Sequence, residues 1–143
     1  AANAGIQFRS QREPNGHAMG YQADIGKGWW GCLYHEHGRK ILAKNQDTEG
    51  KNLKPEKWNK YEILAVDHRI WLAINGRITV ALRDPIGELK GLISLQVHGG
   101  MPQKVIYQPL HFERDPEVHL LGMNEAELNK LLKIAPEGFI KLK

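Results

Sequence analysis

Cysteine is almost absent from this sequence of 143 residues, with Cys32 as its single example. One cysteine cannot close a disulfide bond within the chain, and it offers neither a cysteine-ligated zinc site nor a redox pair. Long hydrophobic runs are absent too, since no apolar stretch approaches the roughly 20 residues that a membrane-spanning helix requires. The sequence therefore predicts no membrane span, and the lone cysteine does not decide the redox compartment.

Blocks of like charge and catalytic signature motifs are also missing. The chain has 20 Lys and Arg against 16 Asp and Glu, which gives a formal net charge of +4 at pH 7. The basic residues are scattered among acidic ones, so no basic stripe supports nucleic-acid binding. There is no phosphate-binding loop, no dinucleotide fingerprint, no Gly-x-Ser-x-Gly elbow and no His-Glu-x-x-His helix. The remaining composition, 41% apolar and 25% charged, is typical of one globular domain.

Short runs of alternating polarity fill the first 113 residues. Gly, Asn, Asp or Pro separate them, as is typical of strands. Closely spaced strands without helices between them favour an all-β sandwich or jelly roll of antiparallel strands. Asn75-Gly76 is the best hairpin signal, because a type I′ turn needs positive φ at both central residues. The predicted strands are 5–9, 19–25, 32–34, 39–43, 61–66, 69–74, 78–83, 92–98 and 105–113.

The last 30 residues have a different pattern. Asn124 is a candidate helix N-cap, with Glu127 three residues later in capping-box order. An apolar stripe follows, and Pro136 ends it. We expect one short α-helix that packs on an edge of the sandwich. The chain then divides into a β-sandwich domain, residues 1–114, and a helical linker or tail, residues 115–143. The apolar stripe consists of Leu128, Leu131 and Leu132.

Three predicted strands carry a glutamine beside a charged or titratable residue. Successive side chains of a strand point to opposite faces, so "GIQFRS", "GYQADIG" and "SLQVHGG" each bury one set and present the other. If these strands share a sheet, its polar face gathers a cation, a carboxylate and an imidazole among amides. The alternative is a solvated outer face, which antiparallel sheets often have. The pairs are Gln7 with Arg9, Gln22 with Asp24, and Gln96 with His98, and the last strand is expected to bury Ile93, Leu95 and Val97.

Tryptophans give a second indication, since their rings stack on the faces of sugars. Trp29 and Trp30 lie in a glycine-flanked loop, Trp58 begins a strand, and these are candidates for the rim of a site. Trp71 lies inside an alternating strand, which favours a place in the core.

The stretch "YHEHGRK" places two histidines at alternate positions. On a strand, His35 and His37 share one face, but two ligands are a weak metal signal and Gly38 indicates an exposed turn. Tyr34 and Glu36 share the opposite face, where Glu36 joins the polar group.

Five motifs in order resemble the 3-keto-disaccharide hydrolase domain family (DUF1080). They are "NAGIQFRS", "GYQADIG", "WGCLYHEHGRKILA", "KWNKYEILAVDHRIWLAINGRITV" and "GLISLQVHGGMPQKVIYQPLHFE", which run from Asn3 to about Arg114. The resemblance implies a concanavalin-like β-sandwich that acts on carbohydrate in secreted or periplasmic bacterial proteins. It also implies that strands usual before the first motif are missing, and that "APEGFIKLK" leads into a second copy. Ala4 replaces the usual Ser, and His35 stands where an acid is common.

The family's chemistry implies roles for the polar group. In a sugar oxidised at C3, a base removes the C2 proton, the C1 oxygen departs, and water adds. His98 suits the base, with Asp24 as an alternative base or as the residue that orients His98. Arg9 suits the enolate oxygen, and Glu36 the acid. The expected substrate-binding residues are Gln7, Gln22, Gln96, Tyr34, Trp30 and Trp58.

Two other functions stay open at this point. Asp24 and Glu36 at a suitable separation would serve a direct two-carboxylate glycosidase. The same polar face and tryptophan rim would equally serve a non-catalytic, lectin-like sugar-binding module. The residues identify no cofactor, and they leave open a divalent metal, the sugar and the oligomeric state. The expected partner is a carbohydrate.

Overall fold

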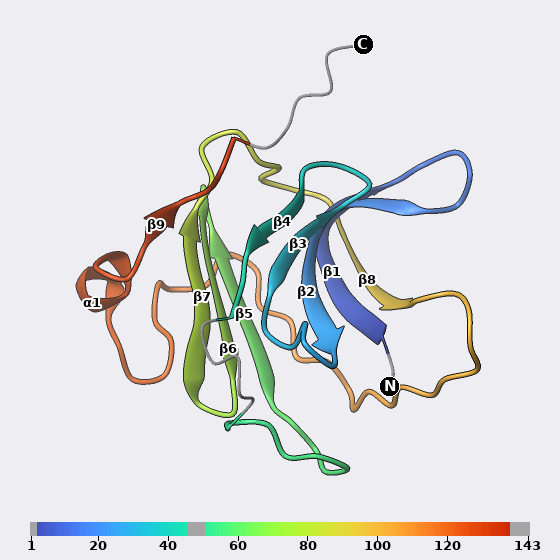
Figure 1. Ribbon diagram of the computed structural model, residues 1–143. Coiled ribbons are helices and arrows are strands. Elements are labelled where there is room, and N and C mark those ends of the chain that lie inside the picture. The colour runs from blue at the N-terminus through green and yellow to red at the C-terminus, as the bar shows by residue number, and fades with distance from the viewer. Residues whose placement is uncertain (1–2, 46–50, 138–143) are drawn as a thin grey trace.

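Two β-sheets packed face to face make up most of the protein (Figure 1). The computed structural model describes residues 3–45 and 51–137. The first sheet has the strand order β4-β3-β2-β1-β8, and the second has the order β5-β6-β7-β9. Neighbouring strands are antiparallel, except for β7 and β9, which pair in parallel. The predicted all-β sandwich with a short C-terminal helix is confirmed.

The strand bounds follow the predicted alternating runs, and β5 and β6 match them residue for residue. The first sheet contains β1 (Asn3–Arg12), β2 (Ala18–Gly26), β3 (Leu33–Glu36), β4 (Lys40–Ala43) and β8 (Leu92–Val97). The second sheet contains β5 (Tyr61–Val66), β6 (Arg69–Ile74), β7 (Arg77–Arg83) and β9 (Lys133–Ile134). The short strand β9 was not predicted.

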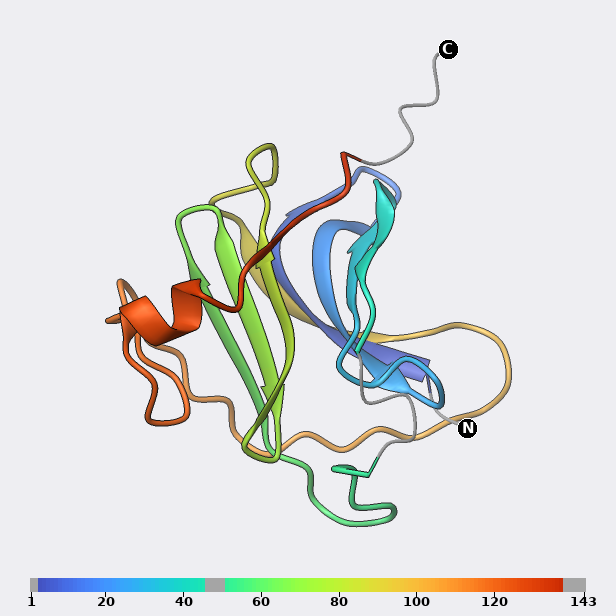
Figure 2. The same cartoon turned by 60° about the vertical axis from the view of Figure 1, so that its left-hand side comes forward.

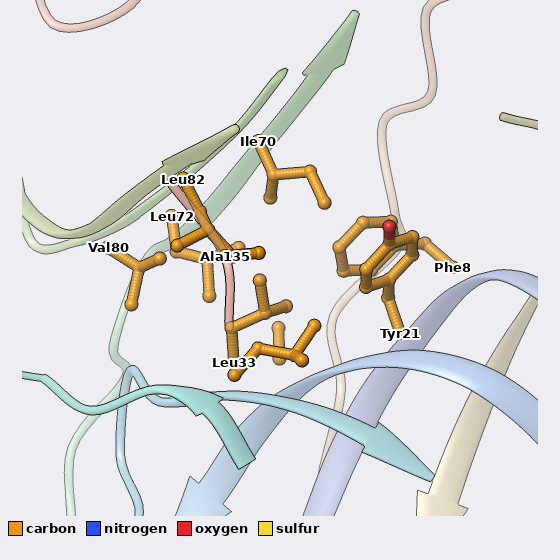
Figure 3. Packing of buried hydrophobic residues seen from close by; sticks show 10 residues of the cluster. Phe8, Tyr21, Leu33, Ile70, Leu72, Val80, Leu82 and Ala135 are labelled. Carbon is orange, nitrogen blue, oxygen red and sulfur yellow. The ribbon is translucent and has the colours of Figure 1, made fainter. Parts of the chain in front are cut away.

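The main core lies between the two sheets. Phe8, Tyr21 and Leu33 point from the first sheet toward Ile70 and Leu72 of the second (Figure 3). The rings of Phe8 and Tyr21 stack with centroids 5.4 Å apart. Full burial of one such side chain contributes about 1.5–3 kcal/mol. Because side chains alternate along a strand, the odd-numbered neighbours of Phe8 in β1 point away from this core.

The outward face of the first sheet is therefore polar, as predicted. Gln7 pairs with Gln22 across β1 and β2, and Gln22 pairs with Tyr34 across β2 and β3. Gly5 lies opposite Asp24 on one side and opposite Gln96 on the other. The register thus brings the predicted polar residues of four strands onto one surface.

Arg9 leaves that surface because β1 has a bulge. The register breaks between Phe8 and Gln11, and Arg9 has a φ of 50°. A bulge re-aims the side chain at the extra residue. The guanidinium of Arg9 donates to the carbonyl oxygen of Asp67 at 2.6 Å and to that of Glu88 at 3.3 Å. The prediction that Arg9 shares a face with Gln7 is wrong.

The apolar side chains of β8 point to the inner side of the first sheet, but the second sheet does not cover them. Leu95 pairs with Ile6, so Ile93, Leu95 and Val97 point inward as predicted. No residue of β8 belongs to the core cluster of the described chain, and these three side chains are 46%, 44% and 53% exposed. Their predicted burial is therefore wrong, because no strand of the second sheet reaches over this edge.

Residues 105–113 form no strand, contrary to prediction. Pro109 lies in the middle of this run and has no N–H to donate to a neighbouring strand. Prolines are tolerated at sheet edges, but here the segment crosses from the first sheet to the second without pairing (Figure 2).

The short helix α1 (Glu125–Asn129) has the predicted capping box between Asn124 and Glu127. It covers the outer face of the second sheet rather than an edge (Figure 2). Leu128 is fully buried, and its carbonyl accepts a hydrogen bond of 3.0 Å from Nε1 of Trp71. Trp71 is therefore core, as predicted. The described part of the chain contains no helix long and apolar enough to cross a bilayer.

The division of the chain at residue 114 stays a prediction. Residues beyond it pack on the sandwich, since Leu128 joins the outer cluster and Ala135 joins the main core. Residues 138–143, which hold most of "APEGFIKLK", lie outside the described residues, so the expected second copy also stays a prediction.

Candidate functional site

A hollow of about 190 Å³ opens on the polar face of the first sheet. Its walls come from β1, β2 and β3, from the turn after β2, and from the end of β8. Six residues predicted for the site line it together, although they come from three separate sequence motifs. The lining residues are Asn3, Gln22, Asp24, Trp29, Tyr34, Glu36, Gln96 and His98.

Asp24 is the residue in this hollow with the most unusual environment. Only 5% of it is exposed, and the described chain places no cation against its carboxylate. Burial raises its pKa to about 6, with a hydrogen bond from Gln22 opposing the rise and the charge of Glu36 adding to it. A carboxylate with a pKa near 6 is suited to accept a proton at neutral pH.

A line of side-chain hydrogen bonds leads to Asp24 across three strands. The hydroxyl of Ser94 donates to Oε1 of Gln7 at 2.8 Å. Nε2 of Gln7 donates to Oε1 of Gln22 at 3.1 Å, and Nε2 of Gln22 donates to Oδ1 of Asp24 at 2.7 Å. Gln7 thus lies beside the hollow and supports its wall from behind.

His98 stands at the exposed end of β8. Its backbone N–H donates to the carbonyl of Asn3 at 2.9 Å, and its carbonyl accepts from Gln103. Its ring atom Nδ1 lies 2.7 Å from the carbonyl oxygen of Gly99. A carbonyl oxygen only accepts, so Nδ1 carries the hydrogen, and Nε2 is the basic atom of the neutral ring.

Tyr34 and Trp29 form an aromatic wall. Their rings meet edge to face, with centroids 6.3 Å apart. Burial raises the pKa of Tyr34, and the charges of Glu36 and Asp24 add to the rise. The phenol therefore stays protonated and remains a hydrogen-bond donor. Trp29, which is 41% exposed, offers its ring surface to the solvent.

Gln96 supplies an unsatisfied acceptor. Its side-chain oxygen is shielded from solvent and has no hydrogen-bond partner within residues 3–45 and 51–137. Because an unpaired buried acceptor costs free energy, a donor brought by a ligand would offset that cost.

Three predicted residues do not join the site. Arg9 is turned away by the bulge. Trp30 lies next to Trp29 but does not line the hollow, and its carbonyl accepts from Asn45. Trp58 is 55% exposed, lies before β5 rather than in a strand, and is not a lining residue either.

The two histidines of "YHEHGRK" diverge. His35 is buried on the core side, where its Nε2 lies 2.9 Å from Glu88. His37 follows the end of β3 with a φ of 55° and packs its ring on His17. They do not share a face, and no group of three or more metal-ligating side chains occurs among the described residues.

Asn3 lines the hollow but was not predicted, and Trp29, predicted only as a candidate for the rim, lines it as well. Asn3 lies on the same face of β1, two alternation steps before Gln7, and pairs with Gly26 at the end of β2. Trp29 and Trp30 have identical sequence signals, and the turn after β2 decides between them. The backbone N–H groups of both donate to the carbonyl of Gly26, a detail that their sequence context does not encode.

A larger hollow of about 500 Å³ lies beside the helix, but its groups are already engaged. The guanidinium of Arg69 binds Asp67, Glu125 and Asn129. Nδ1 of His68 lies 3.0 Å from the carbonyl of Asp84. The smaller hollow on the polar face therefore has the better chemistry for a site.

Comparison with protein families identifies the chain. The 3-keto-alpha-glucoside-1,2-lyase-like domain matches residues 1–112, which agrees with the resemblance of the five motifs. None of the curated proteins matches the sequence. The match covers most of the chain and every residue that lines the hollow. The chain therefore belongs to this family, which suggests a carbohydrate-active role and is consistent with a concanavalin-like sandwich.

Proposed function

We propose that this protein cleaves 3-keto-glycosides by elimination followed by addition of water. The observation that carries the proposal is Asp24, a buried carboxylate whose pKa of about 6 fits a general base and whose Oδ2 accepts no hydrogen bond from the described residues. Family membership supports a sugar as the substrate. The unsatisfied oxygen of Gln96 supports a ligand that carries hydroxyl groups.

The ketone at C3 makes the hydrogen at C2 acidic, because the resulting charge is delocalised onto the ketone oxygen. Oδ2 of Asp24 takes the C2 proton, and the C–H electron pair forms a C2=C3 bond while the ketone becomes an enolate. The enolate then restores its C=O bond, C1=C2 forms, and the C1–O bond breaks. The departing oxygen takes both bonding electrons and a proton. Water adds across C1=C2 to give the free 3-keto sugar.

The other residues of the hollow fit the remaining steps. The protonated phenol of Tyr34 donates a hydrogen bond to the enolate oxygen, the role that we expected of Arg9. His98, when protonated at Nε2, gives the leaving oxygen its proton. Glu36 accepts hydrogen bonds from sugar hydroxyls, and its charge raises the pKa of Asp24. The ring of Trp29 provides the apolar surface for the sugar.

The test compares 4-nitrophenyl 3-keto-glucoside with 4-nitrophenyl glucoside, and follows nitrophenol release. We expect release from the keto compound alone, and slower release when C2 carries deuterium. Asp24→Asn should lower turnover by about a hundredfold or more. The matched control is Asp115→Asn, an exposed aspartate with a φ of 50° that asparagine also tolerates.

Three results would overturn the proposal. Equal release from the ordinary glucoside would indicate a two-carboxylate glycosidase. Binding of the keto compound without any release would indicate a sugar-binding module. Full activity of Asp24→Asn would remove Asp24 from the reaction.

A further inference from the structure

The four side chains that end at Asp24 form one directed series. Ser94 is on β8, Gln7 on β1, and Gln22 on β2, and each faces the next in the register of the sheet. Gln7 and Gln22 are 4% and 3% exposed, so solvent does not compete for their amides. Two buried carboxamides in series with a carboxylate are more than a wet sheet face requires.

The carboxylate fixes the direction of every bond in the series. An ionised carboxylate only accepts, so Gln22 must direct its NH₂ group toward Asp24. The oxygen of Gln22 therefore faces Gln7, which must donate in turn. The oxygen of Gln7 then faces the hydroxyl of Ser94, which donates. No amide in the series can flip without leaving two donors or two acceptors face to face.

We propose that Gln22 is a positioning residue for the general base, held by Gln7 and Ser94 behind it. It occupies Oδ1 of Asp24 and leaves Oδ2 as the oxygen that takes the substrate proton. This inference rests on the proposed function for the role of that proton. The orientation of the carboxylate itself rests on the geometry.

Gly5 makes room for this arrangement. A Cβ atom at residue 5 would lie 2.5 Å from Cγ, 2.6 Å from Cδ and 2.9 Å from Nε2 of Gln22. Distances this short force the neighbouring atoms to move. Gly5 has no positive φ, so alanine fits the backbone, and the three atoms nearest to the added Cβ all belong to the side chain of Gln22. Gly5→Ala thus displaces the amide without deleting a polar group.

Several titratable groups lie near Asp24, in addition to the amide of Gln22 that donates to it. Loss of the Gln22 bond should raise the Asp24 pKa further, because that bond opposes the effect of burial. The other groups remain in place in the variants below, so they serve as a constant background. Glu36 and Tyr34 on β3, Cys32 before β3 and Tyr61 on β5 interact electrostatically with Asp24, and His98 after β8 lines the same hollow.

The experiment titrates the side-chain carboxyl carbon of Asp24 by NMR in the whole protein. We expect the Asp24 pKa to rise by about one unit in Gln22→Ala and by a similar amount in Gly5→Ala. The double variant should match Gln22→Ala, because the added methyl group then has no amide to displace. A merely structural effect of Gly5→Ala would instead add to that of Gln22→Ala.

Kinetics supply the second readout. We expect kcat to fall about ten- to a hundredfold in both single variants, with KM changed less than about twofold. The acid limb of the pH profile should move upward with the pKa of Asp24.

The titration decides the inference even if the proposed function fails. A wild-type protein that cleaves no 3-keto-glycoside, but whose Asp24 shifts as described, removes the function and keeps the positioning role. An Asp24 pKa unchanged in Gln22→Ala, or additive effects in the double variant, overturns the positioning role whatever the activity.

Discussion

Two buried aspartates of this protein have opposite environments. Asp84 follows β7 and is 1% exposed, and Asp24 on β2 is 5% exposed. Arg39 donates to both oxygens of Asp84, and the hydroxyl of Tyr21 adds a third bond. Burial alone would raise the pKa of Asp84, but the bonds from Arg39 and Tyr21 and the charge of Arg39 lower it. Asp24 accepts one side-chain hydrogen bond, from the amide of Gln22, and has a pKa of about 6, which the charge of Glu36 helps to raise.

This difference separates a structural carboxylate from a reactive one. Asp84 joins Tyr21 of the first sheet to the end of β7 in the second, so its ion pair holds the sheets together. Asp24 lies at the wall of a hollow, where no cation of residues 3–45 and 51–137 pairs with it and its ionisation costs free energy. Similar burial therefore says little about role until the neighbouring groups are known.

The largest effect on stability should follow from removal of Arg39, the cation that pairs with Asp84. Arg39→Met leaves the buried carboxylate of Asp84 without its cation, with the Tyr21 hydroxyl as the remaining side-chain donor, and loss of one partner of a buried ion pair typically costs about 3–5 kcal/mol of unfolding free energy. Urea unfolding at pH 7 measures it. Arg83→Met, an exposed arginine next to Asp84, should change stability by less than about 0.5 kcal/mol. An equal loss in both variants would show that Asp84 does not depend on Arg39.

The ionisation of Asp24 is expected to lower the free energy of unfolding, which is the opposite of the contribution of Asp84. Its folded pKa lies above its unfolded value, so the folded state binds more protons between about pH 4 and pH 6, and stability falls as pH rises through that window. Asp24→Asn removes this fall and should be about 2–3 kcal/mol more stable than wild type at pH 7, with the gain vanishing near pH 4. Urea unfolding at several pH values measures the difference. A gain that is the same at every pH would contradict this account.

Asp84 should contribute to the stability of the folded state in a different pH range. Its folded pKa is lowered, so its stabilisation is present above its unfolded pKa and is lost as pH falls through the folded value. Tyr21→Phe removes one of the bonds that lower this pKa and should cost about 1–2 kcal/mol at pH 7. Thermal unfolding checks it against Tyr107→Phe, whose hydroxyl makes only a 3.5 Å contact with Gly5. Comparable losses in the two variants would argue against a special role for the Tyr21 hydroxyl.

The smallest effect should come from the charge near Asp24. Glu36 raises the pKa of Asp24, so Glu36→Gln should lower that pKa by less than about one unit. Carboxyl NMR titration measures it. High salt should change this pKa shift little if the hollow shields the pair from solvent ions. A rise of the Asp24 pKa in Glu36→Gln would refute the expected direction.

Alternation and turn chemistry were enough to predict most of the fold. The runs that became β5 and β6 are mostly apolar and are bounded by turn residues such as Asp67 and Asn75-Gly76, so their bounds were readable. The polar face followed from the same period, because Gln22 and Gln96 each alternate with apolar residues. The helix was readable from Asn124 and Glu127, whose capping bonds are local.

Features that depend on distant partners were not readable. The bulge at Arg9 requires close approach of Gly20 and Gly91, at which a Cβ would lie 2.7 Å and 2.4 Å from the β1 backbone. The exposure of Leu95 depends on how far the second sheet extends, and the ion pair of Asp84 with Arg39 joins residues 45 apart. Such contacts are set by tertiary packing, which a local sequence pattern does not contain.

The bond between Ser94 and Gln7 has a consequence for the order of folding. It joins residues 87 apart in the chain, whereas the hairpin of β5 and β6 pairs residues from Val66 with Arg69 to Tyr61 with Ile74, which are 3 to 13 positions apart. Long-range pairing pays its loop-closure entropy before its contacts form, and it correlates with slow folding. We therefore expect refolding molecules to form the β5–β6–β7 meander early. The carboxylate of Asp24 becomes oriented only when β8 pairs with β1. Catalytic competence would then arrive with the slowest step of the sheet, and partly folded molecules would not carry an active carboxylate.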